Sequence, residues 1–394
     1  MRNRVATPTY QPDLYSRAAI LDPYPHYTRL RELGPVVWLA KQRAYALPRY
    51  AECKAALRDD DTFISGAGVA LNPVANRLSR GTTLNSDGDD HRRRRKLLAQ
   101  HMTPKSLRTM RDAVDRQAVA AVEKAMASGP VDGVELATAL PMSVVPDLIG
   151  WPADGREHLL RWAAATFDAL GPLNGRTLRT SPASIEMMRY TRRLARDGDL
   201  RPESLGAEVL QAAEEGTLSH AECPALLIDY LAPSLDTTIS AISSALHLFA
   251  THPEQWQLLR SDPSLIPNAV NEVVRHQSPL RAFSRKVIRE TELGGTTIPA
   301  DARVVVIYSS ANRDPREWED PDTFDIRRDA SRQIGFGHGT HGCAGQGLAR
   351  LETQAMLQAL TDRVAHIEVA GDPERAVNNI IHRFERLPLH LIPA

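Results

Sequence analysis

The fold is decided by the stretch Phe336-Gly337-His338-Gly339-Thr340-His341-Gly342-Cys343-Ala344-Gly345, which leads into a helix predicted to begin near Cys343. Five glycines between positions 335 and 345 allow the backbone to turn tightly and to approach a flat ligand closely. Free N–H groups and the dipole at the start of a helix favour negative charge, so we expect Cys343 to have a lowered pKa and to be held as a thiolate. The segment therefore predicts a metal-ligating cysteine. The alternative is a buried structural cysteine beside a glycine loop.

Composition excludes several kinds of partner. The chain has 394 residues, of which 42% are hydrophobic and 24% charged, as in ordinary globular proteins. Lys plus Arg and Asp plus Glu both total 48, so net charge gives no reason to expect nucleic acid or an acidic membrane. No apolar run approaches the ~20 residues that span a bilayer, and the polar start from Met1 to Arg17 lacks the apolar core of a signal peptide. We therefore expect a cytoplasmic protein. Its three cysteines are too few for a disulfide framework and wrongly spaced for zinc.

The pattern along the chain predicts a mainly α protein with small β-sheets. We expect a single domain over residues 1–394, with 1–20 as a flexible N-terminal segment. Residues 66–89, rich in Gly, Asn, Ser and Asp, are predicted to form a long loop, and loops of this length are usually functional. Hydrophobic spacing and turn residues predict the remaining elements. The strands are Val36–Leu39, Arg43–Leu47, short strands within Arg285–Val306 around a Gly294–Gly295 turn, one near Ile380, and Leu387–Ile392. The helices are Tyr50–Leu57, Leu107–Met126, Glu157–Leu170, Ser184–Arg196, Pro267–His276 and a last one ending near Val364.

The longest predicted helix runs from Ser219, a good N-cap, to Ala250. It is apolar on several faces, so we expect it to be central and buried. Pro233 lies in its interior, where proline lacks an N–H and its ring clashes with the carbonyl four residues back, at Asp229. We therefore expect a kink or local opening between Asp229 and Thr237.

The run from Phe336 to Gly345 resembles the haem-binding signature of the cytochrome P450 family, with Phe, Gly, His, Cys and Gly at the family's spacing. The resemblance extends from about Asp22 to Pro393. It implies the P450 fold, a haem b (iron protoporphyrin IX) cofactor and monooxygenase activity, with Cys343 as the axial iron ligand. A thiolate on iron pushes electron density toward bound dioxygen and favours O–O cleavage.

Glu272 and Arg275 match the family's Glu-x-x-Arg helix, and i, i+3 spacing puts both charges on one face. The resemblance implies that they form a buried network with Arg328 and that this network supports the cysteine loop. From spacing alone, the commoner alternative is an exposed pair.

Four residues match positions with which the family holds the haem propionates: His91 and Arg95 in a His-x-x-x-Arg pair, Arg285, and His341. Burial of an anionic cofactor edge requires several positive or hydrogen-bonding groups of this kind. The alternative for the arginine-rich stretch after His91 is a solvated basic face.

Asp236 and Thr237 resemble the family's acid–alcohol pair on the long helix. Splitting bound dioxygen requires two protons, which a hydroxyl can orient and a carboxylate can relay. The family usually places Ala/Gly-Gly before the pair, whereas this chain has Pro233 and Ser234. We expect the proline to enforce the helix opening and the Ser234 hydroxyl to join the proton path. The alternative is a polar pair capped by backbone bonds of its own helix.

For the substrate, the chain resembles the branch of bacterial P450s that O-demethylates para-methoxybenzoates. Carried across, the substrate pocket comprises Leu84, Phe167, Leu170, Asp229, Pro233, Leu280 and Phe283, with a contribution from the long loop near Arg80–Leu84. These mostly apolar side chains suit a small aromatic ring, although each alone could be core. That branch holds its substrate carboxylate with Arg and Ser on the long helix, where this chain has Ile228, Asp229 and Ala232. Because like charges repel at low dielectric, we expect a neutral aromatic of the methoxyphenol or alkylphenol type.

The chain contains no flavin or ferredoxin domain of its own, so with O2 it needs an external electron donor, expected to be a ferredoxin-type iron–sulfur protein with its reductase. A second enzymatic reading is a tailoring hydroxylase of a larger natural product. A third is a haem-binding sensor without turnover, against which Asp236 and Thr237 argue. A haem-free structural protein is the last alternative.

Overall fold

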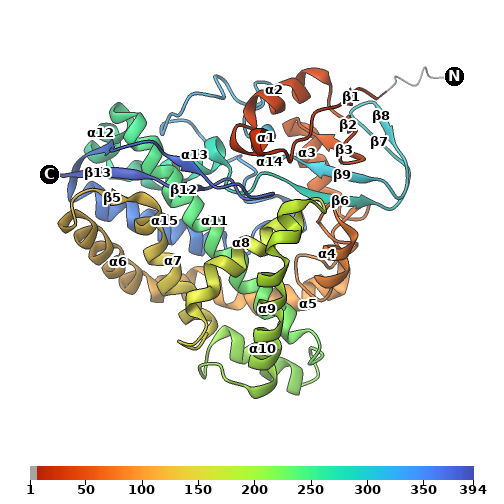
Figure 1. Cartoon of the computed structure of the whole chain (residues 1–394), viewed down its shortest axis with the longest axis horizontal. Coiled ribbons are helices and arrows are strands. Elements are labelled where there is room, and N and C mark those ends of the chain that lie inside the picture. Colours follow the sequence, from red (N-terminus) through yellow and green to blue (C-terminus); the bar gives the residue numbers. More distant parts are fainter. Residues whose placement is uncertain (1–6) are drawn as a thin grey trace.

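The long helix expected from the sequence lies at the centre of the molecule. In the computed structural model, which describes residues 7–394, helix α11 (Cys223–Thr251) crosses the middle of the helical part (Figure 1). Its side chains are buried on several faces, which is why the sequence is apolar nearly all round. It begins four residues later than expected, because the Ser219 N–H and hydroxyl both donate to the Glu222 carboxylate, at 2.8 Å each, in a preceding turn. The helix continues through Pro233, so the opening expected between Asp229 and Thr237 does not interrupt it.

Helices surround α11 on several sides. Those that contact it are α7 (Gly133–Ile149), α8 (Leu159–Leu170), α9 (Gly175–Asp197), α10 (Leu205–Glu214), α12 (Pro253–Ser261), α13 (Ile266–Gln277) and α15 (Gln346–Thr361), while α6 (Pro104–Ala127) packs against α7 and α15. Their apolar faces form the main hydrophobic core with α11. Helix α9 starts well before the expected Ser184, because the Asn174 side chain accepts from the Arg176 and Thr177 N–H groups and caps the first turn.

The largest sheet lies apart from the helical part, at the upper right of Figure 1. Its order is β1 (Thr9–Tyr10), β2 (Val37–Leu39), β3 (Ala44–Leu47), β9 (Arg303–Val306), β6 (Phe283–Val287) and β4 (Phe63–Ile64). The antiparallel pairing of β2 with β3, with Val37 opposite Ala46, confirms the predicted hairpin. Helix α3 (Tyr50–Arg58) and the short α14 (Tyr308–Ala311) pack beside this sheet.

The smaller sheets lie elsewhere. Strands β10 (Val364–Val369), β13 (Pro388–Pro393) and β5 (Val131–Asp132) form one, and β11 (Glu374–Arg375) pairs with β12 (Phe384–Arg386). Strands β7 (Thr291–Leu293) and β8 (Thr296–Ile298) meet at the predicted Gly294–Gly295 turn, where both glycines have positive φ. Ile380 itself lies outside the strands, next to an isolated bridge between Leu280 and Ile381.

Two expectations for the first 90 residues are wrong. From Thr9 onward, the segment expected to be flexible forms strand β1 and helix α1 (Arg17–Leu21), and its Tyr10, Leu14 and Tyr15 side chains are buried against α2 (Tyr24–Leu33) and the sheet. Residues 1–6 lie outside the described part. The long loop at 66–89 contains a short helix, α4 (Pro73–Leu78), capped by Asn72, and it ends where α5 (Gly88–His101) begins. Within residues 7–394, every helix is too short or too polar to cross a bilayer.

Candidate active site

The cysteine loop is a tight turn that precedes α15. The Cys343 N–H donates to the Phe336 carbonyl at 2.7 Å, which closes the loop on itself. Gly337 and Gly339 both have positive φ, and a Cβ atom at Gly339 would lie 2.4 Å from the Leu57 carbonyl oxygen. Only glycine fits these two positions without strain. The loop therefore presents Cys343 just before the first turn of α15.

In the protein alone, the pKa of Cys343 is raised and not lowered as the sequence predicted. Burial raises the pKa of the thiol, and the opposing effects of the Gly345 and Gln346 N–H groups and of Arg95 and Arg350 are smaller. The sequence argument counted the helix start and omitted the cost of burying a thiolate. A metal ion would reverse the balance, because a coordinating thiol loses its proton.

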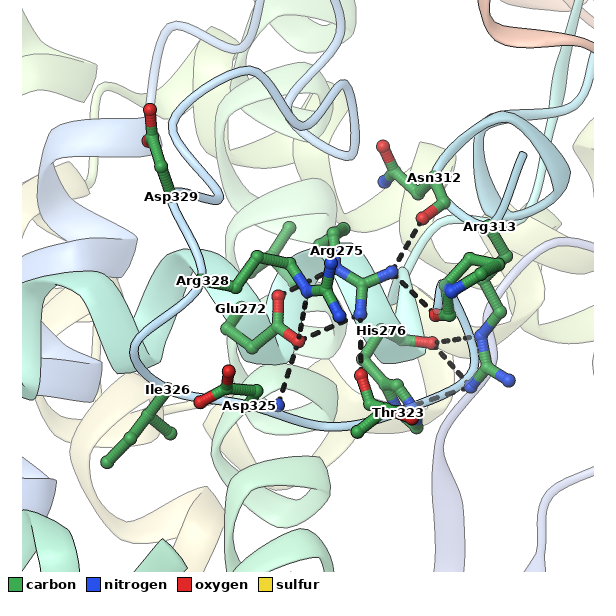
Figure 2. Close-up of polar contacts among 12 residues, drawn as sticks. Glu272, Arg275, His276, Asn312, Arg313, Thr323, Asp325, Ile326, Arg328 and Asp329 are labelled. Carbon is green, nitrogen blue, oxygen red and sulfur yellow. Dashed lines mark hydrogen bonds and ion pairs between the residues drawn. The ribbon is translucent and has the colours of Figure 1, made fainter. Parts of the chain in front are cut away.

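A buried charge network holds the irregular chain that leads into this loop. The Arg275 guanidinium donates to both Glu272 carboxylate oxygens, at 2.6 and 2.8 Å, and both side chains are fully buried. Its other donors bind the backbone carbonyls of Asn312, Pro321 and Thr323, so all five N–H groups are satisfied (Figure 2). Arg328 Nε lies 3.4 Å from Glu272 Oε1.

The same network reaches the cysteine loop through one side chain. The Asn312 carbonyl accepts from Arg275, while its side-chain oxygen accepts from the Ile334 N–H at 2.9 Å, just before the glycine-rich stretch. Helix α13 is thereby tied to both ends of the irregular segment.

A cavity of about 370 Å³ joins the cysteine loop to the distal face of α11. It brings together residues that are far apart in the sequence. Of the site residues predicted above, Leu84, His91, Arg95, Phe167, Leu170, Asp229, Pro233, Ser234, Thr237, Leu280, Phe283, Arg285, Phe336, His341, Cys343 and Gly345 line it. Asp236 is absent from this lining, and Glu272, Arg275 and Arg328 lie outside it in the network described above.

The basic end of the cavity comes from three elements. Helix α5 contributes His91 and Arg95, strand β6 contributes Arg285, and the cysteine loop contributes His341. The His91 and His341 rings lie 4.3 Å apart between centroids, and Arg95 donates to the Gly342 carbonyl at 2.6 Å. Burial, reinforced by His341 and Arg95, lowers the pKa of His91 to about 4, so this imidazole is neutral at pH 7.

The polar residues of α11 divide between two sides of the helix. Thr237 and Ser234 line the cavity, and their hydroxyls donate to the Pro233 and Tyr230 carbonyls, both at 2.7 Å. Asp236 is 2% exposed, and its Oδ1 lies 3.8 Å from Arg383 Nε. Arg383 in turn lies 3.4 Å from Glu385, whose side chain is 60% exposed. A line of charged groups thus leads from the acid–alcohol pair toward solvent.

Asp236 is poised to exchange a proton near neutral pH. Burial raises its pKa to about 6, against the opposing charge of Arg383. Its second oxygen, Oδ2, is buried and has no hydrogen-bond partner among the described residues. A carboxyl with these properties can both take and give a proton at physiological pH.

Opposite the cysteine loop, the cavity has an apolar wall. Phe167 and Leu170 of α8 pack with Val69, Ala70, Ile380 and Ile381, and Leu84, Leu280 and Phe283 pack against this cluster. The residues of this cluster that line the cavity thus come from α8, the 66–89 segment, Leu280 and β6, while Ile380 and Ile381 of the C-terminal segment pack behind them.

Two residues of the site were missed by the sequence argument, and a third, Thr83, was covered only by the predicted contribution of the loop near Arg80–Leu84. Arg383 gave no signal, because its partner Asp236 is 147 positions away along the printed chain. Glu352 lies on α15, lines the cavity, and has both carboxylate oxygens buried without a partner among residues 7–394. Thr83 donates its N–H to Asp229 at 2.8 Å. For Glu352 the sequence does contain a signal, because an acidic residue stands among the apolar residues of a predicted helix.

The residues present fit a haem. Cys343 is a free thiol, and a Cβ atom at neighbouring Gly345 would meet no protein atom within 4 Å, which leaves room for a flat ligand. His91 Nδ1 is buried and makes no hydrogen bond within the described chain, as a group that awaits an anionic partner would, while His341 Nε2 lies 3.4 Å from Asp87 Oδ1. Arg95 and Arg285 add positive charge at the same end.

Comparisons with known proteins agree with this geometry. The Cytochrome P450 family model matches residues 183–384. Cytochrome P450 CYP199A2 of Rhodopseudomonas palustris is 39% identical over 95% of this chain and 92% of its own length. The 6-deoxyerythronolide B hydroxylase of Saccharopolyspora erythraea is 32% identical over 97% of this chain and 99% of its own. The solved structure of Mycobacterium marinum cytochrome P450 CYP268A2 in complex with pseudoionone has a TM-score of 0.89 at 28% identity and covers 98% of this chain and 100% of that one. The chain therefore belongs to the cytochrome P450 family of monooxygenases, which bind haem through a cysteine thiolate.

Proposed function

We propose that this monooxygenase hydroxylates or O-demethylates a small neutral aromatic of the methoxyphenol or alkylphenol type. The observation that carries the proposal is Asp229, whose carboxyl lines the cavity beside Leu84 and Ile228 and is largely removed from bulk water. Burial raises its pKa to about 6, against the opposing effect of the Thr83 hydroxyl and of the Thr83 and Leu84 N–H groups, so it is largely ionised at pH 7.5. A benzoate would bring a second negative charge beside it at low dielectric.

The proposed roles of the chain's residues follow from their positions. Cys343 would hold the haem iron, and haem so bound would supply dioxygen activation. His91, Arg95, Arg285 and His341 would bind the haem carboxylates, with Phe336 and Gly345 against the ring. Thr237 would orient the proton that Asp236 delivers to the oxygen site, with Ser234 beside it. Glu272, Arg275 and Arg328 would hold the approach to the cysteine loop rigid.

The proposal also covers the electron donor and the cellular location of the enzyme. The family requires O2 and redox partner proteins. For this chain we infer a ferredoxin-type iron–sulfur donor with its reductase, acting in the cytoplasm. A screen of ferredoxins that supports NADH-dependent turnover with one such donor would agree, and turnover with a flavodoxin alone would contradict it.

A second candidate function is the tailoring of a larger natural product. The relative named 6-deoxyerythronolide B hydroxylase, similar over nearly the full length of both chains, favours it. The apolar wall that includes Phe167 and Phe283 favours the small aromatic instead, because aromatic side chains pack well against an aromatic ring.

The test is a spin-state titration of the haem-loaded protein. Low-to-high spin conversion is measured with para-methoxyphenol, para-ethylphenol, para-methoxybenzoate and a macrolactone. We expect the two phenols to bind most tightly and to be oxidised with formation of formaldehyde or hydroxylated product. Tight binding of the benzoate or of the macrolactone, with weak binding of both phenols, would refute the proposal.

A further inference from the structure

One end of the cavity is polar, and its chemistry is set by two residues. Asp229 on α11 and Thr83 in the segment before α5 both line the cavity, and the Thr83 N–H donates to Asp229 Oδ2 at 2.8 Å. Leu84 and Ile228 add apolar surface, and Thr82 and Asn85 of the same segment add polar groups. A ligand here therefore meets a carboxylate with both apolar and polar neighbours.

The Asp229 carboxylate is not neutralised by Arg94, the arginine whose charge lowers its pKa. Arg94 lowers the pKa of Asp229, but its guanidinium is bound by Glu222, at 2.7 Å from Arg94 Nη2 to Glu222 Oε1. Asp229 Oδ2 accepts the Thr83 N–H, the Leu84 N–H acts on the same carboxylate, and an ionised carboxylate has about four acceptor positions. Asp229 thus keeps acceptor capacity for a donor that enters the cavity.

The hydroxyl of Thr83 lies at the same end of the cavity. Thr83 is 6% exposed, and its Oγ1 lies near Asp229 and Tyr230, where it favours the charged form of each, although it makes no hydrogen bond of good geometry among the described residues. A buried hydroxyl is rarely left unpaired unless a ligand or water completes it. It can donate to a ligand oxygen that itself donates to Asp229.

The placement on α11 sets the distance to the oxidation site. Asp229, Pro233 and Thr237 lie at i, i+4 and i+8, all line the cavity, and so share one face of the helix. With a rise of 1.5 Å per residue, Asp229 and Thr237 are about 12 Å apart along the helix axis. An aromatic ring held at Asp229 by one substituent would direct the opposite, para substituent toward Thr237.

We propose that Asp229 and Thr83 together form a binding site for a phenolic hydroxyl. The phenol O–H donates to the Asp229 carboxylate, and the Thr83 hydroxyl donates to the phenol oxygen. The substituent para to the hydroxyl is then the one oxidised. This inference rests on the proposed function and adds which group of the substrate is recognised and by which residues.

The test compares two ligands that differ by one methyl group. Dissociation constants of para-methoxyphenol and para-dimethoxybenzene are measured on the haem-loaded protein by spin-state titration and by calorimetry. Capping the hydroxyl as a methyl ether removes the donor and leaves the ring and the reacting methoxy group unchanged. We expect the phenol to bind about 10- to 100-fold more tightly, as for loss of a hydrogen bond to a charged acceptor.

Variants then separate a ligand contact from a structural role. Asp229→Asn keeps an oxygen for the Thr83 N–H, and Asp229→Ala removes it. A purely structural role would weaken both ligands equally, whereas the proposed contact brings the phenol-to-ether ratio close to one in Asp229→Ala and partway there in Asp229→Asn. Thr83→Val should lower the ratio as well. Ser184→Ala, which removes a hydroxyl of the same cavity that has no hydrogen-bond partner in the described part of the chain, should leave the ratio unchanged.

The outcomes distinguish the two proposals. Tight binding of both ligands with equal affinity, or a preference for the phenol that survives in both Asp229 variants, would overturn this inference and leave the proposed function intact. If neither aromatic binds the unmodified protein while a macrolactone does, the proposed function fails and this inference fails with it. If Asp229→Ala does not fold, the ratio in Asp229→Asn decides.

Discussion

Replacement of Glu272 by Gln tests whether the buried charge network holds the fold. The substitution keeps the shape of the side chain and removes its charge. Arg275, fully buried with donors at 2.6 and 2.8 Å from Glu272, and Arg328, at 3.4 Å, would then lose their buried counter-charge. The Asp325 N–H, which donates to Glu272 Oε1 at 3.1 Å, would have a weaker acceptor.

The magnitude follows from burial. Breaking a buried ion pair by removing one partner costs about 3–5 kcal/mol, because it leaves an uncompensated charge at low dielectric. The chain provides a matched control in Arg29 and Glu32, which have the same i, i+3 spacing at 3.0 Å but side chains 59% and 57% exposed. Glu32→Gln should cost at most about 1 kcal/mol, since water screens an exposed pair.

Both variants would be unfolded in urea and followed by far-UV circular dichroism, with the Soret absorbance recorded in parallel. We expect Glu272→Gln to lower the free energy of unfolding by several kcal/mol more than Glu32→Gln and to release haem at lower urea concentration, since Asn312 links the network to the cysteine loop. If the two variants differ by less than about 1 kcal/mol, burial does not control the energetics of this pair and the reasoning is refuted.

Three further predictions concern the site itself. Cys343→Ser should abolish the red-shifted absorption of the reduced, carbon monoxide-treated protein, because a hydroxyl replaces the sulfur ligand; an unchanged spectrum would contradict thiolate ligation. Arg383→Gln should raise the pKa of Asp236 above about 6, because the cation that opposes the effect of burial is lost, and the pH profile of turnover should move to higher pH; Arg386→Gln, which removes an exposed partner of Glu374, is the control and should leave the profile in place. Burial raises the pKa of Glu352 to about 8, so the native state binds a proton that the unfolded state releases, and stability falls as pH rises from the ordinary glutamate pKa to about 8. Glu352→Gln should therefore stabilise the protein at pH 9 and change little at pH 4 in urea titrations; an equal effect at both pH values would contradict this assignment.

The sequence alone determined those features that depend on local patterns. The glycines around Cys343 predict a tight turn, because the turn requires positive φ angles. The apolar faces of the long helix predict its central position. Both features could be predicted because the residues that determine them are near one another in the sequence. The same holds for the β2–β3 hairpin and for the Gly294–Gly295 turn.

Only the tertiary structure decided which distant groups meet and what their surroundings do to them. Asp236 pairs with Arg383 and Thr83 approaches Asp229 because separate elements pack on α11, and no local pattern records these contacts. The Cys343 thiol shows the same limit, since the helix start predicted a lowered pKa and burial raises it. Likewise, strand pairing and side-chain burial order residues 9–20, which composition alone left flexible. Desolvation depends on the whole packed interior, whereas spacing in the sequence fixes only what lies within a turn or two of the chain.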